Sequence, residues 1–190
     1  MILGIISLNE NALEYPQFLF CGSFNPLHWG HIAIIDHVSQ HYGVPVDLEI
    51  SIHNTEKNSI DFSVARQRAD AILAQKKPSF GKLYISDDAR FLEKAATFPD
   101  TTFVCGYDVI YALGKGLCYT PEEFPQAIKY FDDMNIKWLV FPRKTQHGDG
   151  LGEKDYEGFP PDLMKNVAVI NDLPAMDVSS REIRLNHTKL

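Results

Sequence analysis

Short apolar runs alternate with amphipathic stretches along the whole of the 190-residue chain. The apolar runs are rich in β-branched and aromatic side chains, as strands are, and the stretches between them repeat apolar positions at the spacing of a helix. Strands are predicted at 18–21, 46–52, 82–86, 101–105, 136–141 and 166–170. Helices are predicted at 29–42, 61–77, 88–96, 109–113, 121–133 and 178–184.

This alternation predicts an α/β fold built on a doubly wound parallel sheet. The length suits a single domain, with residues 1–16 as an N-terminal arm or edge element and residues 17–190 as the domain itself. The run at 46–52 alternates apolar and polar residues, so this strand is expected to be half-buried. Residues 142–161 hold four glycines and three prolines without periodicity, which predicts a long loop.

Polar residues follow several of the predicted strands. In a doubly wound sheet, ligands bind beyond the carboxyl ends of the strands, where the strand order reverses. The residues expected there are His28, His31, Lys57, Asp108 and Arg143. The segment 18–31 joins a strand, a small-residue turn and a helix start, and the N–H groups and positive end of such a helix predict a phosphate site.

Composition narrows the classes of partner. The formal charge of −7 is opposite to the basic surface that duplex nucleic acid requires, so no nucleic-acid partner is expected. No apolar stretch reaches membrane-spanning length, and no membrane partner is expected. Cys21, Cys105 and Cys118 are odd in number and widely spaced, which predicts neither disulfides nor a zinc pattern. These features favour a cytoplasmic protein.

Three common nucleotide and hydrolase motifs are absent from the sequence. No Gly-x-Gly-x-x-Gly follows the first predicted strand, and no Gly-x4-Gly-Lys-Ser/Thr occurs, so ordinary dinucleotide oxidoreductases and P-loop NTPases are excluded. There is also no Gly-x-Ser-x-Gly elbow of a hydrolase. A phosphate site of another kind is therefore expected at 18–31.

Two motifs resemble those of the nucleotidyltransferase α/β-phosphodiesterase superfamily. HWGH at 28–31 matches its His/Thr-x-Gly-His motif, and DVSSREIR at 177–184 is similar to its Ile-Ser-Ser-Thr-x-Ile-Arg motif. The turn GSFNPLH at 22–28, and GYD at 106–108 followed by Leu113, resemble nicotinamide and nicotinate mononucleotide adenylyltransferases. LEISIHNTEKN (48–58) and FLEKAATFPDTTFVCGYD (91–108) are similar to an adenylyltransferase-like branch associated with CinA-type deamidase domains. The resemblance spans about residues 18–186 and implies a Rossmann-like nucleotidyltransferase fold.

The resemblance also implies a reaction and a set of site residues. The expected reaction transfers an adenylyl group from ATP to a phosphorylated acceptor, nicotinamide or nicotinate mononucleotide, and releases pyrophosphate. The implied catalytic residues are His28, His31 and Arg184. The implied nucleotide-binding residues are Gly22, Ser23, Phe24, Gly30, Gly106, Asp108, Arg143, Ser179, Ser180 and Arg181. Asn25 and Lys57 are expected to bind the acceptor. Mg²⁺ is expected to enter with ATP, held mainly by phosphates and water, with no metal site made by the protein alone.

Several alternatives stay open at this stage. Arg181 stands where the family motif has threonine, which puts catalytic efficiency in question more than binding and leaves a weakly active nucleotide-binding module as one alternative. A cytidylyltransferase acting on a small phosphorylated acceptor is another, because base contacts in this superfamily are mostly made by backbone. His28 and His31 could instead bind zinc, but no third ligand stands at a suitable spacing. The sequence leaves a homo-oligomer open.

Overall fold

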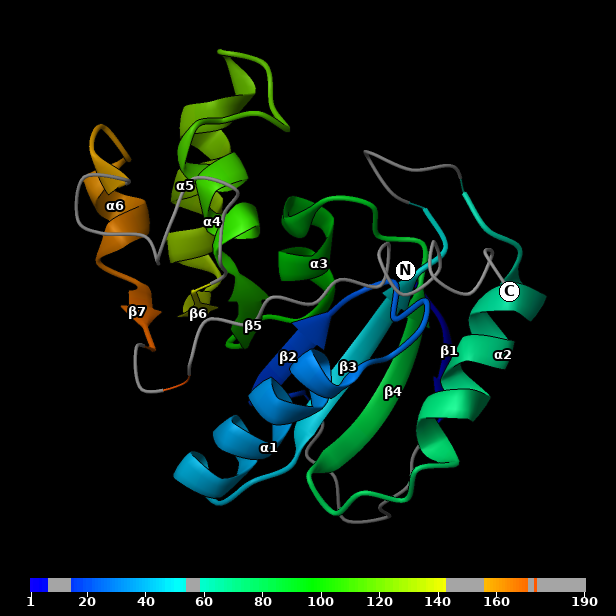
Figure 1. Ribbon diagram of the computed structural model, residues 1–190. Coiled ribbons are helices and arrows are strands. Elements are labelled where there is room, and N and C mark those ends of the chain that lie inside the picture. The colour runs from blue at the N-terminus through cyan, green and yellow to red at the C-terminus, as the bar shows by residue number, and fades with distance from the viewer. Residues whose placement is uncertain (7–14, 54–58, 143–155, 171–172, 174–190) are drawn as a thin grey trace, which may run out of the picture.

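The computed structural model describes residues 1–6, 15–53, 59–142, 156–170 and 173. Its strands are β1 (Ile2–Ile6), β2 (Phe18–Cys21), β3 (Val46–Ser51), β4 (Phe80–Ser86), β5 (Thr102–Gly106), β6 (Lys137–Phe141) and β7 (Val167–Val169). Its helices are α1 (Trp29–Tyr42), α2 (Phe62–Leu73), α3 (Phe91–Thr97), α4 (Tyr107–Gly114), α5 (Glu123–Asp133) and α6 (Pro161–Met164). All six predicted strands are present, and five predicted helices correspond to α1 to α5 (Figure 1). The sixth, at 178–184, lies outside the described residues.

The seven strands form one sheet in the order β1-β4-β3-β2-β5-β6-β7. Strands β2 to β7 run parallel to their neighbours, whereas β1 pairs antiparallel with β4. The prediction of a parallel, doubly wound sheet is therefore confirmed for the six predicted strands, and a seventh, antiparallel strand lies in the segment expected to be an N-terminal arm or edge element. An antiparallel strand at the edge of an otherwise parallel sheet is common, because no crossover helix is needed to place it. The N-terminal arm thus includes an edge strand.

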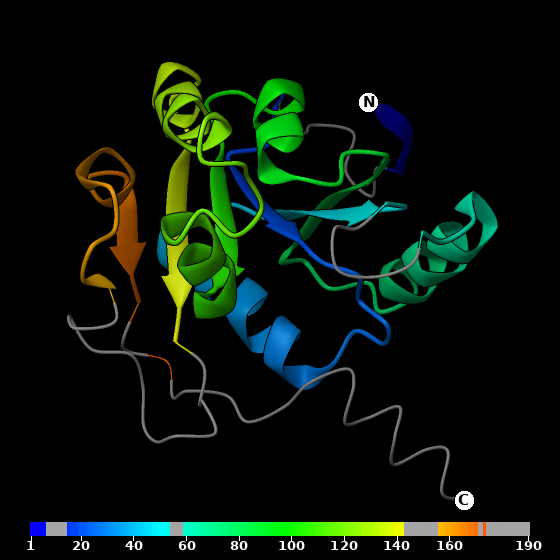
Figure 2. The ribbon, with the colours of Figure 1, turned by 90° about the horizontal axis from the view of Figure 1, so that it is seen from above.

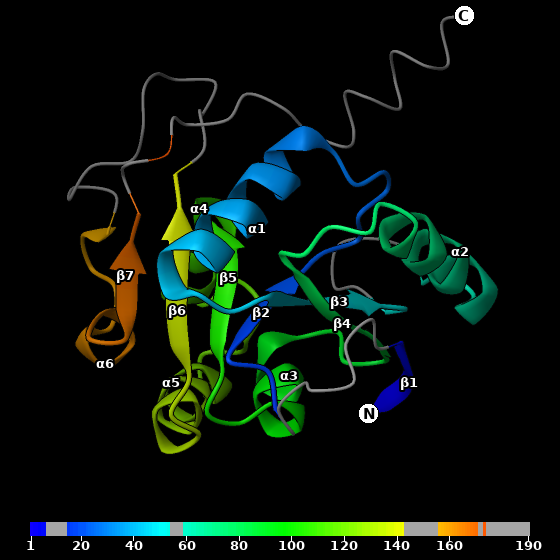
Figure 3. The same cartoon turned by 90° about the horizontal axis from the view of Figure 1, so that it is seen from below.

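Helices cover both faces of the sheet. The views from above and below show α1 and α2 on one face and α3 and α5 on the other (Figures 2 and 3). The core under α1 and α2 is mainly aliphatic, and the opposite core contains a cluster of aromatic rings around Trp138, Phe103 and Phe131. Among the helices that the structure describes, none combines the length and the apolar character needed to cross a membrane.

The two acidic residues of β3 are buried, contrary to the half-buried strand predicted at 46–52. Asp47 is 8% exposed and Glu49 is 1% exposed. Strand β3 lies between β2 and β4, and helices cover both faces of the sheet, so neither side of the strand meets solvent. Buried polar groups must then find partners inside the protein. The backbone N–H of Lys82 donates to Asp47 Oδ1 at 2.7 Å, and the partners of Glu49 belong to the region of the site.

The long loop predicted at 142–161 is only partly described, and its last residues lead directly into α6. This short helix begins at Pro161 and is followed by β7. Proline suits the first position of a helix, because its missing N–H would have no partner within the helix anyway. Its four residues are too few to show a helical period, so the sequence pattern gave no sign of α6.

Candidate active site

The strand order of the sheet reverses between β2 and β5, which are parallel neighbours in register from Phe18–Thr102 to Phe20–Val104. The chain leaves β2 toward α1 and β3 on one side, and leaves β5 toward α4 and β6 on the other. The N-termini of α1 and α4 therefore follow the carboxyl ends of the two strands at the switch point. This is where an open α/β sheet binds its ligand.

His28 and His31 lie together at the start of α1. His28 is the N-cap residue of the helix, and its backbone N–H donates to Nδ1 of His31 at 3.3 Å. The two imidazole rings stack with centroids 3.7 Å apart. A backbone N–H can only donate, so Nδ1 of His31 acts as the acceptor, which leaves Nε2 as the ring position that can donate. The helix start thereby presents a ring N–H donor that could bind an anion.

Phe24 supports His31 from within the protein. Its ring is 3% exposed and packs edge-on against the rings of His31 and Phe20. A Cβ on Gly22 would lie 2.9 Å from Cζ of this ring, so glycine at 22 leaves room for it. The sequence places Phe24 among the nucleotide-binding residues, and in the structure its ring is buried against His31 and Phe20.

The turn between β2 and α1 is anchored by two neighbouring elements. The backbone N–H of Gly22 donates to the carbonyl oxygen of Glu49 on β3 at 3.0 Å. Nη1 of Arg68 on α2 donates to the carbonyl oxygen of Ser23 at 3.0 Å. Asn25 then precedes a cis peptide bond to Pro26. Sequence reasoning did not find Arg68, because it stands on the polar side of a helix 45 residues away from its partner.

A buried ion pair lies next to this turn. Nζ of Lys94 on α3 is 2.7 Å from Oε1 of Glu49, and the Ser86 hydroxyl donates to the same oxygen at 2.5 Å. Lys94 also donates to the carbonyl oxygen of Asp88 at 2.7 Å. Burial alone would lower the pKa of Lys94, but the charge of Glu49 and the hydrogen bond to it outweigh burial and raise it. This network joins β3, β4 and α3 beside the carboxyl end of β2. There, Cys21 of β2 lies opposite Glu49 of β3 in the register of the two parallel strands.

The second half of the switch point is formed by Gly106 and Asp108 at the start of α4. Gly106 is the N-cap residue, and the exposed Asp108 follows in the first turn. A Cβ on Gly106 would lie 2.5 Å from Oδ1 of Asp108, so the carboxylate is turned back over the cap. A carboxylate here stabilises the helix start and can also accept hydrogen bonds from hydroxyl groups or face a cation.

Neither thiol near the switch point is suited to act as a nucleophile. Burial raises the pKa of Cys21 well above its usual value, and the charge of Glu49 adds to the shift. Burial also raises the pKa of Cys105, with a further contribution from Asp108. The reactive form of cysteine is the thiolate, so both side chains stay protonated and inert at neutral pH. This arrangement favours direct group transfer over a covalent cysteine intermediate.

The structure brings together the part of the predicted site that follows β2 and β5. Gly22, Ser23, Phe24, Asn25, His28, Gly30 and His31 belong to the first turn and the start of α1, and Gly106 and Asp108 belong to the start of α4. Gly30 is buried within the first turn of α1. The remaining predicted residues, Lys57, Arg143, Ser179, Ser180, Arg181 and Arg184, lie outside the described residues. Within the described part of the chain, no group of three or more metal-ligating side chains comes together.

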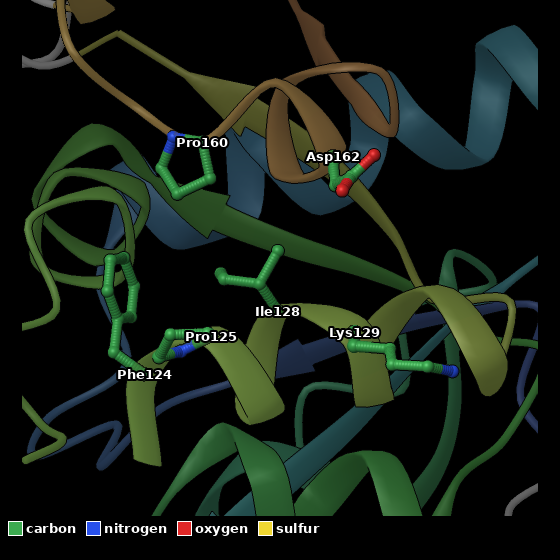
Figure 4. A pocket seen from close by; sticks show the side chains of 6 residues that line it. All are labelled: Phe124, Pro125, Ile128, Lys129, Pro160 and Asp162. Atoms are coloured by element: carbon green, nitrogen blue, oxygen red, sulfur yellow. The ribbon is translucent and has the colours of Figure 1, made fainter. Parts of the chain in front are cut away.

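A separate surface pocket of about 290 Å³ lies between α5 and α6 (Figure 4). Its lining residues are Phe124, Pro125, Ile128, Lys129, Pro160 and Asp162. The two charged side chains are already paired on the surface, Lys129 with Asp133 and Asp162 with Lys165. None of the predicted site residues lines this pocket, so the switch point remains the candidate site.

The comparisons with known proteins concern the family and the fold. The chain is a nucleotidyltransferase, and the family match that shows this covers almost the full length of the chain. It belongs to the Cytidylyltransferase-like family, whose sequence model matches residues 19–186. The resemblance of the chain to the nucleotidyltransferase superfamily is thereby confirmed.

The comparison with solved structures confirms the fold. Plasmodium falciparum nicotinic acid mononucleotide adenylyltransferase complexed with NaAD superposes with a TM-score of 0.57 at 16% sequence identity. The match covers 88% of this chain and 82% of that chain. At this identity the likeness establishes the shared Rossmann-like nucleotidyltransferase architecture. No sequence among the curated proteins matches the chain.

Proposed function

We propose that the protein transfers an adenylyl group from ATP to a phosphorylated small-molecule acceptor, nicotinate or nicotinamide mononucleotide, with release of pyrophosphate. The observation that carries the proposal is the pair His28 and His31 at the start of α1, beside the point where the strand order reverses. The choice of acceptor is supported by the structural neighbour, which is named for nicotinic acid mononucleotide and is complexed with NaAD.

The reaction requires the protein mainly to position two anions. A phosphate oxygen of the acceptor attacks the α-phosphorus of ATP, a new P–O bond forms, and the bond from the α-phosphorus to the bridging oxygen breaks. Pyrophosphate leaves with the electron pair of that bond. Nε2–H of His31 and the N-terminus of α1 would stabilise the charge that develops on the phosphate oxygens. No protein nucleophile is required, in keeping with the protonated thiols of Cys21 and Cys105.

Mg²⁺ is part of the proposal as the ion that accompanies ATP. Its preferred ligands are oxygens of phosphates, water and one or two carboxylates, and Asp108 is an exposed carboxylate at the switch point that fits this requirement. When bound, the ion would neutralise negative charge on the phosphates. The protein residues assigned to the phosphates are His28 and His31, with Ser179, Ser180, Arg181 and Arg184 proposed as a second cradle.

The remaining assignments in the proposal concern the base and the acceptor. Gly22, Ser23, Gly106 and Arg143 are assigned to the nucleotide, and Asn25 and Lys57 to the acceptor. A second candidate function is cytidylyl transfer to a small phosphorylated acceptor, which is favoured by the description of the family to which the chain belongs. Both candidates use the same phosphate chemistry, so they differ only in the base and the acceptor.

A pyrophosphate-release assay tests the proposal. ATP and CTP would each be combined with nicotinate mononucleotide, nicotinamide mononucleotide and glycerol 3-phosphate in the presence of Mg²⁺. Turnover with ATP and either mononucleotide supports the proposal. Turnover only with CTP would instead support the second candidate function, cytidylyl transfer. Binding of ATP without turnover for any pair would leave a nucleotide-binding module, and the proposed reaction would be wrong.

A further inference from the structure

Phe24 adopts a backbone conformation that side-chain-bearing residues rarely occupy. Its φ is +39°, in the left-handed region, while its ring is buried beneath His31. Such a conformation is strained and persists only where the surroundings hold it. The ring is held by the core, since it packs on Phe20 and against the bare Cα of Gly22. The value of φ also depends on the orientation of the peptide unit that precedes Phe24, between Ser23 and Phe24, so this peptide needs a restraint of its own.

Arg68 supplies that restraint. Its Nη1 donates to the carbonyl oxygen of Ser23 at 3.0 Å, and its side chain reaches the turn from α2. The peptide unit between Ser23 and Phe24 is planar, so this one hydrogen bond sets the direction of the Ser23 carbonyl and of the Phe24 N–H together. With the ring fixed on one side and the peptide plane fixed on the other, φ of Phe24 is fixed as well.

We propose that Arg68 is a positioning residue of the active site, which holds the Ser23–Phe24 peptide and, through the Phe24 ring, the imidazole of His31. The proposal rests on the proposed function only for its effect on turnover. The ring of His31 has the Phe24 ring at 5.2 Å on one side and the stacked His28 ring at 3.7 Å on another, so a rotation of Phe24 moves a group that contacts His31 directly. A displacement of about 1 Å at a catalytic group can reduce the rate roughly 100-fold.

Replacing Arg68 with alanine tests the proposal, and Arg66→Ala is the matched control. Arg66 stands on the same helix, its side chain is 51% exposed, and it pairs with Asp70 on the surface. We expect Arg68→Ala to lower kcat roughly 10- to 100-fold while the KM values for nucleotide and acceptor change little. Added guanidinium ion at millimolar concentration should restore part of the lost turnover, since it can occupy the vacated donor position. The control variant should keep the parent kcat.

Nuclear magnetic resonance of the ligand-free protein provides a readout that does not depend on turnover. The amide signal of Phe24 and the ring signals of His31 should shift in Arg68→Ala and stay in place in Arg66→Ala. Shifted signals in a protein with no activity on any tested pair would support the positioning role while the proposed function fails. If Arg68→Ala does not fold, Arg68→Met keeps the aliphatic stem and allows the same measurements.

Two results would overturn the proposal. Parent kcat and unchanged signals in Arg68→Ala would mean that the turn keeps its conformation without the guanidinium. A raised KM for ATP or acceptor with parent kcat would make Arg68 a substrate-binding residue instead of a positioning residue.

Discussion

Replacement of Lys94 with methionine would leave the carboxylate of Glu49 buried without its cation. The two side chains are 6% and 1% exposed, and the atoms Nζ and Oε1 are 2.7 Å apart. Removal of one partner from a buried pair of this kind costs about 3–5 kcal/mol, because the remaining charge keeps its desolvation penalty. The whole stability of a domain is about 5–15 kcal/mol, so Lys94→Met is expected to lose a large share of it.

The neutral double variant separates the charge from the packing. In Glu49→Gln with Lys94→Met, neither side chain of the former pair carries a charge, and the glutamine oxygen can still accept the hydrogen bond from the Ser86 hydroxyl. We expect this variant to regain most of the stability that Lys94→Met loses. The surface pair Lys129–Asp133 provides the control, because Lys129 is 72% exposed and its replacement by methionine should cost only about 0.3–0.5 kcal/mol.

Urea unfolding followed by circular dichroism and tryptophan fluorescence would measure these differences, because Trp138 is buried in the aromatic core. If Lys94→Met costs no more than Lys129→Met at pH 8, the pair is not desolvated and the reasoning is wrong.

Three further predictions concern single positions. His31→Ala should lower turnover roughly 100- to 1000-fold in the pyrophosphate-release assay, because a donor to the developing charge is lost; parent turnover would remove His31 from the mechanism. Burial raises the pKa of Asp47 from 3.8 to about 6, so the native state holds this proton longer than the unfolded chain and stability should fall as pH rises through that window. Asp47→Asn should abolish this pH dependence, and above pH 6 it should be more stable than the parent by about 3 kcal/mol at most. An equal slope of the free energy of unfolding against pH in both proteins would contradict the assignment of the pH dependence to Asp47. Gly114→Ala would place a Cβ 2.2 Å from Cδ2 of Phe159 and should lower the free energy of unfolding by about 1–3 kcal/mol, whereas an unchanged Tm would show that the ring moves away at no cost.

The order of the elements could be predicted because strands and helices carry local signals. The run at 18–21 is apolar throughout, and the structure buries it as the strand β2 between β3 and β5. The polar turn that follows and the histidine pair mark the start of α1 correctly at Trp29. The short helix α6 gave no signal, since its four residues span about one helical turn.

The environment of each polar residue could not be predicted in the same way. The alternation of apolar and polar residues at 46–52 predicts a strand with one solvent-exposed face. The alternation itself contains no information about which elements of the fold cover that face. Glu49 and Lys94 are 45 positions apart, and they meet only because α3 packs over the central strands. Arg68 and Ser23 are likewise separated by 45 positions. Long-range pairs of this kind depend on which helix face meets which strand, and a single local pattern does not contain that information.

The sequence by itself determined the α/β fold class through its strand–helix alternation, and it placed a phosphate site at the helix start marked by HWGH, while the class of protein followed from the resemblance of its motifs to the nucleotidyltransferase superfamily. Tertiary structure decided how that motif is held. The Phe24 ring lies under His31, the Arg68 guanidinium fixes the preceding peptide, and the Glu49–Lys94 pair is enclosed next to the turn. The reason is physical: the backbone pattern of a helix start is set by neighbouring residues, whereas the orientation of a side chain in a packed interior is set by whatever surface the fold brings against it.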